Sequence, residues 1–134
     1  MKETLDEKSR DALVQYRLDR ADETMKEAEI LAKESHFNAA VKRLYYACYY
    51  AATALLVANG FNSQTHAGTK TLLSLHFVSQ GKLPNDCGKT FSRLFEIRHS
   101  GDYDDFVYCD KEMIDEYTPK AEDFIKAIKA LLNK

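Results

Sequence analysis

Residues 37–58 read FNAAVKRLYYACYYAATALLVA, and this stretch decides the fold. Apolar and mostly small side chains recur along it at spacings of four, three, four, three and four: Ala40, Leu44, Ala47, Ala51, Ala54 and Ala58. This spacing keeps the side chains on one face of an α-helix, and small residues let a second helix approach closely. A second apolar line runs beside the first: Val41, Tyr45, Cys48, Ala52 and Leu55. A helix that is apolar over most of its girth is predicted to be the central element of a bundle.

Helical periodicity also dominates on both sides of this stretch. It predicts further helices over residues 9–34, 67–79, 85–100 and 111–132, with short connections that favour antiparallel neighbours. Asn59-Gly60 is typical of a left-handed helix cap, Thr65 of an N-cap, and Ser100-Gly101 of a helix end. Pro119 indicates either a kink or the true first turn of the last helix. We expect an all-α, up-and-down bundle of four main helices plus a shorter one, in a single domain over residues 1–134.

Composition excludes several classes of function. The chain has 134 residues and a net charge of −2, so it lacks the basic field that holds nucleic acids nonspecifically. It contains no apolar run long enough to span a membrane. Its three widely spaced cysteines fit reduced thiols in a cytoplasmic protein. No histidine pair at i,i+4, no CxxC and no glycine-rich phosphate loop occurs, so neither a metal site nor a cofactor is predicted.

The segment that begins at Arg98 is the sharpest candidate for chemistry. Arg98 continues the apolar line of its helix, and a guanidinium on a buried side needs an anionic partner. Residues 36–100 carry seven basic and two acidic groups, whereas residues 101–116 carry one basic and seven acidic groups. One interpretation is a salt bridge to the following loop, with Asp102 orienting Arg98. The other is an arginine that faces a phosphate, with His99 or Tyr103 as the group that transfers protons.

A tyrosine-rich patch forms the second candidate. Tyr46 and Tyr50 share one edge of the central helix, and Arg43 lies one turn before Tyr46. Tyrosines at such positions commonly bury their rings and direct their hydroxyls to water or to a partner. The alternatives are a dimer surface or a platform on which bases stack. We therefore take Arg43, Tyr46 and Tyr50 as a possible binding surface for a second subunit or a ligand.

The chain resembles the HEPN domain family, the small helical "higher eukaryotes and prokaryotes nucleotide-binding" proteins, and in particular its short stand-alone prokaryotic branch. The resemblance covers nearly the whole chain and rests on the order and spacing of several motifs: the string from Ala39 to Ala47, Ala54-Leu55-Leu56, His66-Ala67-Gly68, Phe77-Val78, Arg98 with Asp102-Tyr103, and Phe124 with Ile128. It implies a helical bundle that forms homodimers, with the arginine motifs of the two copies facing each other. It also implies genetic and physical pairing with a minimal nucleotidyltransferase, since many relatives are metal-independent ribonuclease toxins that this partner restrains.

In one respect the sequence departs from the family motif, in which a histidine follows the arginine after four to six residues. Tyr103 stands at the first of those positions, and His99 directly follows Arg98. A tyrosine with a pKa near 10 is a poor general base at neutral pH, and an acidic loop repels RNA. We therefore expect a homodimeric partner of a minimal nucleotidyltransferase in a toxin–antitoxin-like pair, with weak or no catalysis of its own.

Two alternatives remain open. The first is a metal-independent endoribonuclease toxin that uses Arg98 with Tyr103 or His99 on an RNA substrate. The second is a bundle that senses a nucleotide. The resemblance also implies that Tyr103 could accept AMP from the partner enzyme.

Overall fold

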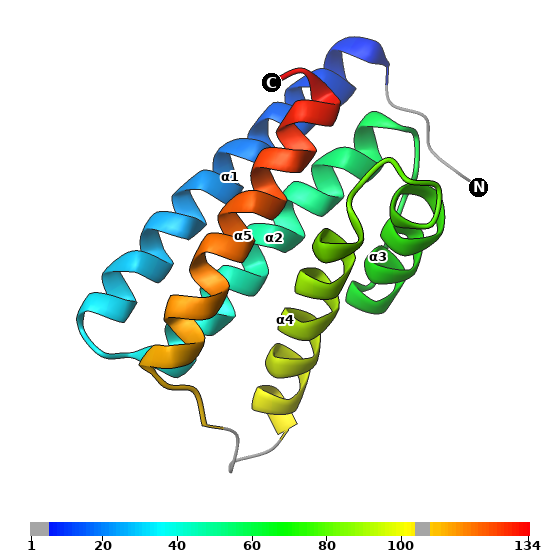
Figure 1. The fold of residues 1–134 in the computed structure, drawn as a ribbon. Helices are drawn as coiled ribbons and strands as arrows, with labels where there is room; N and C mark the ends of the chain where they lie inside the picture. The colour runs from blue at the N-terminus through cyan, green and yellow to red at the C-terminus, as the bar shows by residue number, and fades with distance from the viewer. Residues whose placement is uncertain (1–5, 104–107) are drawn as a thin grey trace.

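The computed structural model describes residues 6–103 and 108–134, and every regular element in these ranges is helical (Figure 1). The elements are α1 (Glu7–Lys33), α2 (Phe37–Ala58), α3 (His66–Leu73), a π-helical turn η1 (Ser74–Val78), α4 (Asn85–Tyr103) and α5 (Lys111–Leu132). Figure 1 shows the four long helices side by side, with consecutive ones running in opposite directions. The prediction of four main helices plus a shorter one is therefore confirmed. No helix in the described ranges combines the length and apolarity that a bilayer crossing requires.

Helix ends follow local side-chain chemistry. The carboxylate of Asp6 accepts a hydrogen bond from the Ser9 amide at 2.7 Å and starts α1, and the Thr65 hydroxyl accepts one from the Gly68 amide at 2.8 Å and starts α3. These bonds satisfy amides that have no partner inside the helix. After α2, Gly60 has a φ of 79°, which fits glycine best and which confirms the left-handed cap predicted from the sequence.

Helix α2 is the centre of the bundle, as its two apolar lines predict. It packs against α1, α3, α4 and α5. Its buried residues occupy almost every direction around the axis: Ala40, Val41, Leu44, Tyr45, Ala47, Cys48, Ala51, Ala52, Thr53, Ala54, Leu55 and Leu56. The alanines in this set leave room for neighbouring backbones, while the bulkier side chains fill the space between them.

Three details differ from the sequence-based predictions. Helix α4 does not stop at Ser100-Gly101 but continues to Tyr103, because a single glycine costs only about 1 kcal/mol in a helix interior. The predicted helix over 67–79 begins at His66 and loosens into the turn η1 after Leu73. Of the two alternatives for Pro119, the first turn of the last helix is wrong, because Pro119 lies inside α5. Asp102 and Tyr103 therefore belong to the last turn of α4 and not to a loop.

The packing of α2 makes a direct prediction. Replacing buried Ala51 by leucine forces extra methylene groups into a filled interface, so Ala51→Leu should lower the free energy of unfolding by about 1–3 kcal/mol. Urea denaturation measures this loss. Ala39→Leu, at an exposed position on the same helix, is the matched control and should change stability by less than about 0.5 kcal/mol. Equal stability of the two variants would contradict the central position of α2.

Candidate functional site: an arginine oriented by a tyrosine of the central helix

Arg98 reaches from α4 to α2. Its Nη2 donates a hydrogen bond to the hydroxyl oxygen of Tyr46 at 2.9 Å. The guanidinium carbon also lies 5.6 Å from the centroid of the Tyr46 ring, within the range of a cation–π contact. The Arg98 side chain is half-buried. The hydroxyl and the ring of Tyr46 thus both contribute to the direction of the guanidinium.

Arg43 brings a second positive charge to the same ring. Its guanidinium carbon lies 5.0 Å from the centroid of Tyr46, and its Nη1 is 3.4 Å from a carboxylate oxygen of Glu27 on α1. Two guanidinium groups, one from α2 and one from α4, therefore contact a single tyrosine. The carboxylate of Glu27 offsets part of the charge that Arg43 brings.

His66 joins this group from a third helix. Its Nδ1 lies 2.7 Å from the hydroxyl of Tyr45, its ring stacks on Tyr49 with centroids 4.2 Å apart, and its centroid is 5.8 Å from that of Tyr46. As the first residue of α3, His66 is held by the tight start of that helix. A side chain at Gly68 would place its Cβ 2.8 Å from the capping hydroxyl of Thr65, so only glycine fits there without a shift.

Tyr45 is buried, and burial raises the pKa of its hydroxyl, an effect that the nearby charge of Arg98 partly offsets. The phenol is therefore protonated at neutral pH. When Nδ1 carries the proton of the imidazole, it donates to the phenol oxygen, and Nε2 is the nitrogen that can accept a proton. The arrangement resembles the orientation of an imidazole by a second group in proton-transfer sites.

The structure separates the other candidates from the sequence. Tyr50 does not join Arg43 and Tyr46, because the guanidinium of Arg20 on α1 lies over the Tyr50 ring at 5.2 Å from its centroid. The imidazole of His99 is exposed and parallel to the ring of Phe95, with centroids 6.1 Å apart. The side chains of Asp102 and Tyr103, and all of residues 104–107, lie outside the part of the chain that the structure describes.

Sequence reasoning missed His66 as a site residue and assigned it only to the start of its helix. The imidazole comes from a segment 32 positions before Arg98, and the two groups bond to adjacent tyrosines of α2, Tyr45 and Tyr46. The available signal was Tyr45, since a buried tyrosine hydroxyl requires a polar partner. Among the described residues, no group of histidine, cysteine and acidic side chains could hold a metal ion.

The bond between Arg98 and Tyr46 can be tested by removing one oxygen. Tyr46→Phe keeps the ring but leaves the guanidinium without this acceptor, so the free energy of unfolding should fall by about 1.5–3 kcal/mol. Chemical denaturation measures the change, and Tyr16→Phe, at a tyrosine that is 59% exposed, should leave it unaltered. If Tyr46→Phe were as stable as the wild type, the bond would not hold the guanidinium.

Comparison with known proteins gives the family. The chain matches the HEPN domain family over residues 14–131. It is 35% identical over 123 residues to a Thermotoga maritima protein named "UPF0332 protein", a match that covers 92% of this chain and 93% of the relative. It is 29% identical over 121 residues to a Methanocaldococcus jannaschii protein named "putative toxin", with 90% of each chain covered. Because the family match spans most of the sequence, the chain belongs to the HEPN domain family.

Proposed function

We propose that this protein is the HEPN component of a toxin–antitoxin-like pair. It acts as a homodimer that binds a minimal nucleotidyltransferase and has weak or no catalysis of its own. The observation that carries the proposal is the half-buried guanidinium of Arg98, oriented by Tyr46 beside the second guanidinium of Arg43. The relative from M. jannaschii that is named "putative toxin" supports the same class of function.

The geometry explains why a partner would bind there. A guanidinium that is already oriented loses little side-chain freedom when it meets a carboxylate or a phosphate, so its bidentate bonds are strong. Residues 101–116, which follow Arg98 closely in the sequence, carry seven acidic groups and disfavour binding of free RNA, whereas a folded partner can make direct contacts. The three cysteines are buried free thiols, which supports a place in the reducing cytoplasm.

Co-purification tests the proposed pair. We expect the tagged protein to retain a minimal nucleotidyltransferase encoded beside it, and Arg98→Ala to weaken that complex by about ten-fold or more, since a charge-assisted bond is worth roughly 1.5–3 kcal/mol. Arg93→Ala, on the same helix with a side chain that is 54% exposed, is the matched control. Sedimentation measures the dimer in the same samples. A monomer that retains no such enzyme would contradict the proposal.

A second candidate function follows from His66. A metal-independent endoribonuclease needs a base that takes a proton from the ribose 2′-hydroxyl while this oxygen attacks the adjacent phosphorus and the 5′-oxygen leaves with a proton. It also needs a cation for the charged transition state. The imidazole of His66 and the guanidinium of Arg98 both lie near the ring of Tyr46. This chain lacks the histidine of the family motif. His66 is thus a better candidate for the base than His99, whose imidazole is exposed.

Toxicity and RNA ends distinguish the two candidates. If the ribonuclease is real, expression should arrest growth and leave RNA fragments with 2′,3′-cyclic phosphate ends. Arg98→Ala and His66→Ala should each lower cleavage by about 10²-fold or more, within the range of general acid–base and electrostatic catalysis. His36→Ala is the control, at an exposed histidine without a capping bond. Intact RNA with the wild-type protein would leave only the binding function.

A further inference from the structure

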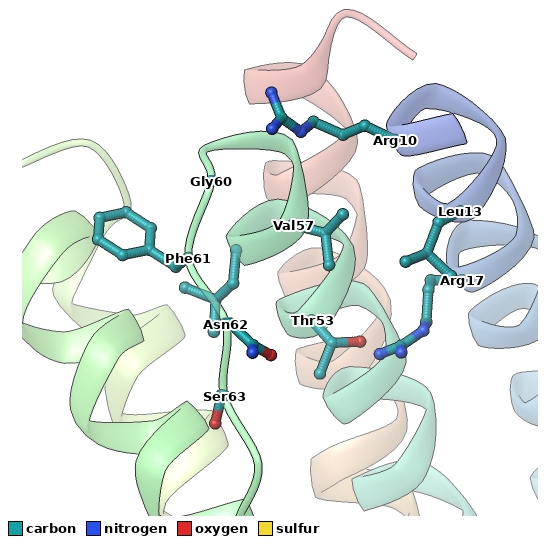
Figure 2. A pocket seen from close by; sticks show the side chains of 10 residues that line it. Arg10, Leu13, Arg17, Thr53, Val57, Gly60, Phe61, Asn62 and Ser63 are labelled. Atoms are coloured by element: carbon teal, nitrogen blue, oxygen red, sulfur yellow. The ribbon is translucent and has the colours of Figure 1, made fainter. Parts of the chain in front are cut away.

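A second site lies along α2, away from Arg98. A cavity of about 240 Å³ opens between the first half of α1, the last turns of α2 and the segment that leads to α3 (Figure 2). Thr53, at its α2 wall, is seven residues from Tyr46, or about 10 Å along the helix axis. The cavity therefore does not share the groups that orient Arg98, and its function can be tested independently of the proposed pair.

One face of α1 supplies positive charge to this cavity. Arg10, Leu13 and Arg17 follow the i, i+3, i+7 spacing and all line it. Both arginines are half-buried. Within the described part of the chain, no ion pair or hydrogen bond engages the guanidinium of Arg17, whereas Arg20, one turn further on, is bonded to Glu23 at 2.9 Å. Among the described residues that line the cavity, none is acidic.

The opposite wall adds polar atoms and an apolar surface. Figure 2 shows the guanidinium of Arg17 and the side-chain amide of Asn62 both pointing toward Thr53. The Thr53 hydroxyl donates to the carbonyl oxygen of Tyr50 at 2.9 Å, so it can offer only its oxygen to a ligand, as an acceptor. Leu13 and Val57 form an apolar wall between the two arginines. An occupant thus meets positive charge, an amide and a hydroxyl at one end, and hydrocarbon beside them.

We propose that this cavity binds a small phosphate monoester, with the phosphate at Arg17 and Asn62 and the organic group against Leu13 and Val57. The planar fork of the Arg17 guanidinium fits the oxygens of a phosphate, and its positive charge offsets part of the phosphate charge. The cavity is smaller than the roughly 300–1,000 Å³ of pockets that take drug-sized ligands, which restricts the occupant to a small molecule. The NH₂ group of Asn62 can donate the hydrogen bond that the Thr53 oxygen accepts.

Thermal unfolding and calorimetry with phenyl phosphate test this site at constant ionic strength. A ligand that binds only the native state raises its stability, so the melting temperature of the full-length protein should rise by several degrees. Inorganic phosphate should raise the melting temperature less than phenyl phosphate does. Benzoate, which carries a single charge, should also raise it less than phenyl phosphate does. Arg17→Gln should lower the affinity for phenyl phosphate by about ten-fold or more, because it removes a charge-assisted hydrogen bond. Arg93→Gln is the charge-matched control, because Arg93 belongs to α4 and does not line the cavity.

Asn62→Asp keeps the test decisive if Arg17→Gln does not fold. Asn62 is exposed, so the substitution leaves the core intact while it places a carboxylate where the phosphate would lie. It should abolish the shift caused by phenyl phosphate. The proposal would be overturned by the absence of any shift in the wild type, by an equal shift with benzoate, or by unchanged binding in both variants.

Discussion

Helix α2 must be covered by protein in almost every direction, and this requirement arranges the other helices. Its buried positions face α1, α3, α4 and α5 in turn. Burial of each large apolar side chain stabilises the fold by about 1.5–3 kcal/mol. The bundle is therefore most stable when no apolar face of α2 is exposed to solvent. The alanines set how closely the long helices approach. The other helices pack around α2 and bury its apolar faces.

The same constraint builds the candidate site. Tyr45, Tyr46 and Tyr49 place large rings at the edge of α2, where packing favours burial but each hydroxyl still needs a polar partner. Tyr45 obtains His66 from α3, and Tyr46 obtains Arg98 from α4. Covering the tyrosines thus draws an imidazole and a guanidinium from separate segments to one place. The proposed function rests on that group of side chains and not on the bundle as such.

Local signals in the sequence were sufficient for the fold. The apolar lines of residues 37–58, the Thr65 cap and the glycine at position 60 all depend on neighbours within a few residues, and the structure confirms them. Arg98 could be singled out because a charge on an apolar line needs an explanation. The end of α4 was mispredicted, since Gly101 is compatible with both a helix interior and a helix end. His66 and the partner of Tyr50 depend on which helix lies opposite, and a single sequence does not contain that information.

Arg98 is thus the group on which the functional interpretation depends, and its side-chain NMR signals are the most direct measure of it. Nitrogen-15 spectra of the arginine side chains, with Arg98 assigned from Arg98→Lys, can be recorded before and after addition of the nucleotidyltransferase. The interpretation predicts that the Arg98 signals shift when the complex forms, while those of Arg93 stay in place. A complex that forms without any change at Arg98 would contradict it and would place the binding surface elsewhere on the molecule.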